Sequence, residues 1–232
     1  QLTARPHGIV LVTGPTGSGK TTTLYSTLKL LASPELNVCT IEDPIEMVEP
    51  QFNQMQVQPA IGLDFASGVR TLMRQDPDII MVGEIRDRDT ADMAVQAALT
   101  GHLVLSTLHT NDAPSTITRM IDMGIEPFNV ASAVNLIVAQ WLVRRICKEC
   151  KQEYEYSPEE VAALGLSAKE LAGITFYKGG GCDTCNGTGY KGRAGLYEVM
   201  ALSPELRRMI LRGASTAEVQ DQAVKEGMLT LR

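Results

Sequence analysis

The stretch that decides the fold runs Gly14-Pro15-Thr16-Gly17-Ser18-Gly19-Lys20-Thr21. It follows the apolar run Ile9–Val12, and it precedes a segment in which Leu24, Leu28 and Leu31 share one helical face. Glycines allow backbone N–H groups to curl around phosphates without a clashing Cβ, and the N-terminus of the following helix adds favourable partial charge. The pattern G-x-x-x-x-G-K-S/T between a strand and a helix therefore predicts a phosphate-binding loop.

We expect this loop to bind ATP and Mg²⁺. Lys20 is expected to reach the terminal phosphates, and Thr21 is expected to offer its hydroxyl to Mg²⁺. The expected nucleotide-binding residues are those of the loop and the residue after it, namely Gly14, Pro15, Thr16, Gly17, Ser18, Gly19, Lys20, Thr21 and Thr22. The alternative, a glycine-rich turn without function, is disfavoured by the flanking strand and helix.

Four short apolar runs predict buried strands at Ile9–Val12, Val38–Ile41, Ile79–Val82 and Leu103–Leu105. Helical patterns alternate with them, which favours a parallel sheet covered on both faces. The later part of the chain is mainly helical in pattern, with helices expected at Ala113–Met123, Phe128–Arg145, Pro158–Leu171, Pro204–Arg212 and Thr216–Glu226. Composition shifts near Cys147, so we expect an α/β P-loop core over residues 1–146 and a mainly helical C-terminal subdomain over residues 147–232.

The 232 residues are 44% apolar and 21% charged, with a net charge of −6. This balance suits a globular protein and argues against one that binds nucleic acid through a basic face. The most apolar stretch, residues 128–143, contains the polar residues Asn135 and Gln140, so we expect a buried helix there and no membrane span. We see no signal peptide, and the chain begins with Gln1, which indicates an excised fragment.

Acidic side chains follow two of the predicted strands. Glu84 comes shortly after Ile79–Val82, and Glu42 and Glu46 follow Val38–Ile41. The carboxyl ends of parallel strands meet at one edge of a sheet, and a P-loop enzyme needs carboxylates there to hold Mg²⁺ and orient the attacking water. We expect Glu84 and Glu46 to be catalytic, and Glu84 and Glu42 to bind Mg²⁺ together with Thr21. The alternative is that these acidic residues are solvated or cap helices.

His109 follows the Leu103–Leu105 strand and should reach the same edge, where it is a candidate γ-phosphate sensor. A lone histidine after a strand also fits an ordinary hydrogen-bonded residue, and His102 is assigned such a structural role. Arginines stabilise the charge that develops in phosphoryl transfer, often across a subunit boundary. The spacing does not choose among the candidates for this task, which are Arg70, Arg74, Arg86, Arg144 and Arg145.

Four of the five cysteines form two Cys-x-x-Cys pairs, Cys147 with Cys150 and Cys182 with Cys185. Four thiolates in two such pairs match tetrahedral Zn²⁺, and because no position is left open for water we expect a structural site. The alternative is a set of redox-active or unmetallated cysteines. Cys39 lies in a predicted strand and is expected in the core. This cysteine usage favours a reducing, cytosolic compartment.

Together these segments resemble the secretion ATPase superfamily, most closely the type IV pilus extension ATPases and their type II secretion counterparts. The resemblance covers nearly the whole chain, and it implies that the P-loop core is RecA-like. Its carriers are a Walker A loop at residues 14–23, an Asp box at residues 40–46, a Walker B segment at residues 76–87, a His box at residues 100–111 and the two cysteine pairs, which resemble a zinc module that retraction ATPases lack. The resemblance implies that Glu84 is the catalytic glutamate, that His109 contacts the γ-phosphate and that Arg144 senses phosphate.

The resemblance also implies a homo-hexamer that lies on the cytoplasmic side, peripheral to the inner membrane. ATP hydrolysis in such a ring would move an inner-membrane platform protein so that pilin subunits enter the fibre. The family's preceding domain, which is similar to a PAS fold and supplies arginines in trans, is missing from this sequence, so we expect the fragment to bind nucleotide and hydrolyse it slowly. Trp141 stands where the family commonly has arginine.

Three other functions stay open at this point. A type II secretion ATPase is the nearest, although the residues Asp112-Ala113-Pro114 favour pili. A nucleic-acid translocase would share the RecA-like core, but the acidic charge argues against nucleic acid as a partner. A P-loop scaffold that binds nucleotide without turnover is the third.

Overall fold

The computed structural model describes residues 6–163 and 173–231. The chain divides into two compact units, the first made of Gln1–Trp141 with Leu196–Arg232 and the second of Leu142–Gly195. Helices in the described parts of the chain are all too short or too polar to cross a membrane.

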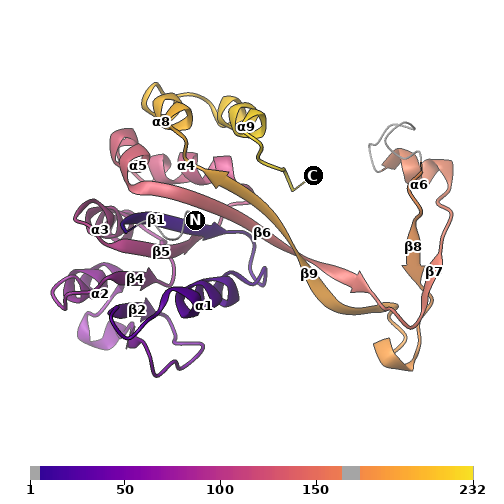
Figure 1. Cartoon of the computed structure of the whole chain (residues 1–232), viewed down its shortest axis with the longest axis horizontal. Coiled ribbons are helices and arrows are strands. Elements are labelled where there is room, and N and C mark those ends of the chain that lie inside the picture. The colour runs from indigo at the N-terminus through magenta and orange to yellow at the C-terminus, as the bar shows by residue number, and fades with distance from the viewer. Residues whose placement is uncertain (1–5, 164–172, 232) are drawn as a thin grey trace. The chain divides into compact units, whose positions relative to one another are not determined.

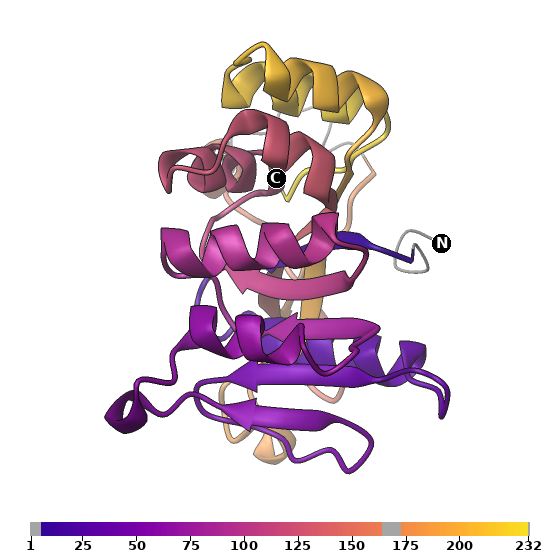
Figure 2. The same cartoon turned by 90° about the vertical axis from the view of Figure 1, so that its left-hand side faces the viewer.

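A seven-stranded sheet forms the centre of the fold, in the order β3-β2-β4-β5-β1-β6-β9. Its strands are β1 (Gly8–Thr13), β2 (Val38–Glu42), β3 (Asn53–Gln56), β4 (Ile79–Val82), β5 (Leu103–Leu108), β6 (Val134–Ile146) and β9 (Tyr190–Ala201). All pairs from β3 through β6 are parallel, and Figure 2 shows the arrows of this part of the sheet pointing the same way. The predicted α/β class with a mainly parallel sheet is confirmed, and so are the four predicted strands.

Helices cover both faces of this sheet (Figure 1). They are α1 (Lys20–Leu31), α2 (Phe65–Leu72), α3 (Arg88–Leu99), α4 (Ala113–Asp122), α5 (Pro127–Ala133), α8 (Pro204–Leu211) and α9 (Thr216–Lys225), with a 3-10 turn, η1, at Pro59–Ile61. Side chains alternate along the strands: Val10 and Val12 pack with α1, whereas Ile9 and Leu11 belong to the larger core on the other face. Such strands read as continuous apolar runs because both faces are buried.

The prediction of one helix over Phe128–Arg145 is wrong. The helix α5 ends at Ala133, and the chain then enters β6, which pairs in parallel with β1. A continuous apolar run fits a buried helix and a buried strand equally well by periodicity. Here the β-branched residues Val134, Ile137 and Val138 fit a pleated surface, and pairing with β1 decides the outcome.

The expected division into residues 1–146 and 147–232 is also wrong. The predicted helices near the C-terminus exist as α8 and α9, but α8 packs against α5 and α9 against α4, within the first unit. Their apolar faces, which include Leu206, Met209 and Val219, join the same core as Val130 of α5. Burial of these amphipathic faces against the sheet domain, and not sequence proximity to the cysteines, sets the boundary.

The second unit is not mainly helical in its described part. It contains the antiparallel pair β7 (Lys151–Glu153) and β8 (Tyr177–Gly179), a short helix α6 (Pro158–Ala163) and a 3-10 turn, η2 (Asp183–Cys185). The rings of Tyr154, Tyr156 and Phe176 stack edge to face, at centroid distances of 4.8 and 5.0 Å. The helix predicted over Pro158–Leu171 is confirmed through Ala163, and its remainder lies outside the described residues.

Candidate nucleotide and metal sites

The predicted phosphate loop connects β1 to α1, as the sequence indicated. Gly14, Gly17 and Gly19 have φ angles of 141°, 76° and 87°, a region that favours glycine. A Cβ atom on Gly14 would lie 2.2 Å from the carbonyl oxygen of Gln140, so a side chain there would clash with β6. The glycines thus permit the tight path of the loop and its close approach to the neighbouring strand.

The open end of α1 and the Lys20 ammonium together make a site suited to an anion. The N-cap residue of α1 is Gly19, which has no side chain to cap the helix, so the first backbone N–H groups are available to an anion. Lys20 is buried, and its Nζ donates to the carbonyl oxygens of Gly14 at 2.9 Å and Pro15 at 3.0 Å. Burial lowers the pKa of Lys20, while the charge of Glu84 opposes that shift.

Gln140 of β6 hydrogen-bonds the phosphate loop and the start of α1, a role that the sequence analysis did not predict. Its side-chain nitrogen Nε2 donates to the carbonyl oxygen of Ser18 at 2.7 Å, and its Oε1 accepts from Thr23 Oγ1 at 2.6 Å. The side chain is 3% exposed. A polar residue inside an otherwise apolar strand was the available signal, but its partners lie more than 110 residues away in the chain.

A cavity of about 240 Å³ brings the predicted catalytic residues to the phosphate loop. Its lining includes four loop residues, Thr16, Gly17, Lys20 and Thr21, and four predicted partners, Glu42, Glu46, Glu84 and His109. These partners follow β2, β4 and β5, whose carboxyl ends meet at this edge of the parallel sheet. The cavity is smaller than the 300–1,000 Å³ typical of pockets that enclose a whole small molecule. Its size suits the phosphate end of a nucleotide.

Both carboxylate oxygens of Glu84 have partners. His109 Nε2 lies 2.9 Å from Oε1, and Arg86 Nε lies 2.7 Å from Oε2. Arg86 also reaches Asp43 Oδ2 at 3.4 Å. The Glu84 side chain is 18% exposed, so it is held in a defined orientation at the cavity wall while solvent still reaches it.

Threonines fix the loop that carries His109. The backbone N–H of Thr110 donates to Thr13 Oγ1 at 2.9 Å, and the two threonine hydroxyls are 2.6 Å apart. Because Thr13 ends β1 directly before the phosphate loop, the histidine is tied to that loop through its neighbour. Trp141 Nε1 adds a hydrogen bond of 3.1 Å to the carbonyl oxygen of Asn111. His102 instead contacts the Ala97 carbonyl through Nδ1 at 2.9 Å, as expected of a structural residue.

Glu42 and Glu46 differ sharply in environment. Glu42 is 3% exposed, and its carboxylate accepts hydrogen bonds from Tyr25, Thr40 and Gln54. Burial, followed by the hydrogen bond to Glu42, raises the pKa of Tyr25. Glu46 is exposed at the cavity rim. The donors around Glu42 occupy its lone pairs, so Glu46 and Glu84 are the carboxylates more available to a metal or a water molecule.

Of the candidate arginines, Arg86 lines the cavity and pairs with Glu84. Arg144 belongs to the second unit, where its guanidinium lies 4.1 Å from the ring centroid of Tyr190. Arg70, Arg74 and Arg145 are exposed. The phosphate-sensing role of Arg144 stays a prediction.

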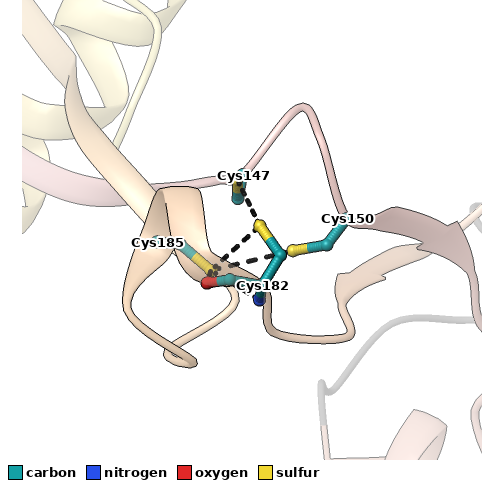
Figure 3. A group of neighbouring side chains, drawn as sticks. All are labelled: Cys147, Cys150, Cys182 and Cys185. Carbon is teal, nitrogen blue, oxygen red and sulfur yellow. Dashed lines mark hydrogen bonds between the residues drawn. The ribbon is translucent and has the colours of Figure 1, made fainter.

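The four paired cysteines converge in the second unit, as Figure 3 shows. Their sulfur atoms all lie within 4.8 Å of one another. Three sulfur pairs are 3.7 to 3.9 Å apart, namely Cys182–Cys185, Cys150–Cys185 and Cys147–Cys182. Tetrahedral Zn–S bonds of 2.3 Å would place sulfur atoms about 3.8 Å apart. The donor set and its spacing therefore fit Zn²⁺.

Backbone turns and hydrogen bonds hold the second cysteine pair, Cys182 and Cys185, in position. Asn186, Gly187 and Gly189 have positive φ angles, and the N–H groups of Cys182 and Gly189 donate to Cys185 Sγ at 3.3 and 3.2 Å. Desolvation opposes ionisation of Cys185, yet these donors lower its pKa to about 6. Desolvation raises the pKa of Cys150 to about 12. A thiolate stabilised by N–H donors is typical of a metal ligand. Cys39 is fully buried in β2, as predicted.

The glycine loop, the lysine and the acidic edge of a parallel sheet define this chain as a P-loop protein of the α/β class. A family model places it more narrowly. Residues 1–232 match the model described as type II/IV secretion system protein, T2SSE, and the chain belongs to that family.

Curated relatives carry two kinds of name. The chain is 56% identical to the type IV pilus assembly ATPase TfpB of Acinetobacter baylyi, over 100% of this chain and 40% of that protein. It is 48% identical to PilB of Pseudomonas aeruginosa, over 98% of this chain and 40% of that protein. It is 51% identical to type II secretion system protein E of Dickeya dadantii, over 92% of this chain and 42% of that protein. The chain thus spans less than half the length of these relatives.

Solved structures show the same architecture. The pilus retraction motor PilT with bound ADP superimposes with a TM-score of 0.65 and 28% identity, over 99% of this chain and 61% of that chain. The Legionella pneumophila ATPase DotB superimposes with a TM-score of 0.67 and 28% identity, over 97% of this chain and 53% of that chain. The α/β fold with a mainly parallel sheet is therefore shared with the pilus retraction motor PilT and the ATPase DotB.

Proposed function

We propose that this chain is the motor part of an ATPase that drives type IV pilus assembly. One observation carries the proposal: Lys20, Thr21, Glu84 and His109 line a single cavity at the carboxyl edge of the sheet. In this arrangement Lys20 and the N-terminus of α1 hold the terminal phosphates, Thr21 offers a hydroxyl to Mg²⁺, and Glu84 orients the attacking water. The ADP bound to PilT and the names of the curated relatives support it.

His109 has a defined task in this proposal. It faces the same carboxylate that orients the water, at 2.9 Å, and the threonine contacts keep it next to the phosphate loop. A histidine in this position can contact the γ-phosphate and Glu84 together, so that binding of the phosphate changes the contact to the carboxylate. Mg²⁺, when bound, would neutralise charge on the phosphates, and Glu46, which lines the cavity, would hold one of its water ligands.

The size of the cavity and the length of the chain both favour a nucleotide site that this chain alone does not complete. The cavity fits phosphates, and the relatives contain more than twice as many residues as this chain. We propose that the intact protein is a homo-hexamer in which a preceding domain and a neighbouring subunit complete the nucleotide site with arginines. The 232-residue chain alone should then bind ATP and turn it over slowly.

We propose a cytoplasmic location, peripheral to the inner membrane, with an inner-membrane platform protein as the partner that receives the motion. The cysteine cluster would hold a structural Zn²⁺ ion through Cys147, Cys150, Cys182 and Cys185. Four protein thiolates leave no coordination position for a reacting water, so the ion would be structural and would cross-link the turns that carry the cysteines in the second unit.

The second candidate is a type II secretion ATPase, which the 51% identity to the Dickeya dadantii protein favours. The chemistry at the cavity would be identical in both cases, so only the partner separates them. Copurification of the full-length protein with its own platform protein, and the identity of that protein, decides between a pilus and a secretion machine.

Nucleotide binding by the chain itself tests the proposed site first. Titration with a fluorescent, non-hydrolysable ATP analogue should saturate for the unchanged chain, and Lys20→Ala should weaken binding at least about tenfold because it removes a charge-assisted contact to phosphate. Lys225→Ala is a control for loss of a lysine elsewhere, since Lys225 is exposed at the end of α9 and does not line the cavity. Equal binding by all three proteins would refute the site.

A further inference from the structure

Tyr25 lies on α1 at the centre of a buried hydrogen-bond network. The side chain is 2% exposed, and its ring packs 6.2 Å from the ring of Phe52. Its hydroxyl contacts both carboxylate oxygens of Glu42, at 2.8 and 2.7 Å, and the carbonyl oxygen of Met47 at 2.9 Å. One phenol thus joins the helix of the phosphate loop to the end of β2 and to the loop after it.

Gln54 of β3 closes the network from the other side. Its Nε2 contacts the Tyr25 hydroxyl at 2.8 Å and the Met47 carbonyl at 2.9 Å, and its Oε1 accepts from the Glu49 N–H at 2.7 Å. Thr40 adds a hydrogen bond of 2.6 Å to Glu42. The segment from residue 43 to residue 49 is therefore pinned at its middle and at its end by side chains from the sheet and from α1.

The two elements joined by Tyr25, α1 and the segment after β2, both carry residues that line the cavity. Lys20 and Thr21 stand one turn earlier on α1, and Asp43 and Glu46 stand on the pinned segment. Burial and Glu42 keep the phenol protonated, because both raise its pKa, so the hydroxyl remains a donor at physiological pH. Loss of this hydroxyl would leave the phosphate loop intact and remove a fixed link to the acidic wall.

We infer that Tyr25 is a positioning residue, which sets the acidic segment 43–49 at a fixed distance from Lys20 and Thr21 so that Mg²⁺ bound to a nucleotide meets the acidic wall. In this reading Glu42 is the anchor of the network and not a metal ligand. The inference rests on the proposed function, since it names the residues that hold the metal half of that same site.

Tyr25→Phe tests this inference, because it keeps the ring against Phe52 and removes only the hydroxyl. Affinity for a fluorescent, non-hydrolysable ATP analogue is measured with Mg²⁺ and with EDTA. Affinity with Mg²⁺ should fall about tenfold, the size of one charge-assisted hydrogen bond, and affinity with EDTA should change less than twofold. Tyr197→Phe, which removes a hydroxyl from an exposed side chain on β9, should change neither.

A purely structural role for Tyr25 would lower both affinities equally, and that result, or no change in either, overturns the inference. Hydrogen exchange gives a second readout: the amides of residues 45–49 should exchange faster in Tyr25→Phe and in Gln54→Leu, while those of β4 and β5 stay protected. Unchanged exchange in both variants also overturns it. Absence of nucleotide binding by the unchanged chain would instead refute the proposed function.

Discussion

Replacement of Gln140 by leucine probes how the phosphate loop is held in place. Leucine has a similar volume and lacks both polar atoms, so the carbonyl oxygen of Ser18 loses its 2.7 Å donor and Thr23 loses its 2.6 Å acceptor. Gln140 is 3% exposed, which makes replacement of these bonds by water difficult. The predicted nucleotide-binding residues themselves are unchanged by this substitution.

The size of the effect follows from these two contacts. Each buried polar group left without a partner costs about 1–3 kcal/mol. If about 1.4 kcal/mol of this cost falls on the ordered form of the phosphate loop, nucleotide affinity drops about tenfold. The remainder destabilises the whole first unit, so the melting temperature should fall by about 3–8 °C.

Both quantities can be measured on the same preparation. A fluorescent ADP titration gives the affinity, and thermal unfolding with and without nucleotide gives the stability. Gln96→Leu is the matched control, because Gln96 is exposed on α3. Affinity of Gln140→Leu within twofold of the unchanged chain would refute the claim that β6 holds the loop.

Other predictions concern the metal cluster and a buried carboxylate. Cys182→Ser should reduce bound zinc from about one ion per chain to near zero by metal analysis, whereas Cys39→Ala should leave it unchanged, since Cys39 lies in the core of β2. Zinc in both variants or in neither would contradict the assignment. Glu198→Leu should lower the melting temperature by about 5–10 °C, because Glu198 is 2% exposed and accepts from the N–H groups of Ala113 and Leu231. Glu35→Leu, at an exposed position, should leave the melting temperature unchanged. An equal fall in both variants would contradict a stabilising role for the buried Glu198 carboxylate.

The sequence predicts which residues meet at the cavity because the signals for them are local. Gly14 to Thr21 are contiguous, and Glu84 and His109 each come within a few residues of an apolar run that becomes a strand. Parallel pairing then fixes that these ends meet, without any knowledge of side-chain contacts. Two x₂-spaced cysteine pairs carry a similar local signal, and the sulfur atoms do converge.

The features that the sequence does not predict are those that depend on contacts between distant segments. The apolar run that ends in β6 has no period that separates helix from strand, and only pairing with β1 decides it. Gln140 and Tyr25 gain their roles from partners in other elements, and a polar side chain in an apolar strand does not reveal which backbone it will meet. The helices α8 and α9 follow the cysteines in sequence but bury their apolar faces in the first unit.

The most direct test of the whole account is phosphate release by the full-length protein carrying Glu84→Gln. Glutamine keeps the shape of the side chain and can still face His109, but it cannot act as a carboxylate toward the attacking water. We predict ATP-analogue affinity within about threefold of the unchanged protein and a hydrolysis rate at least about a hundredfold lower. Hydrolysis at the unchanged rate would contradict the assignment of Glu84, and with it the proposed catalytic site.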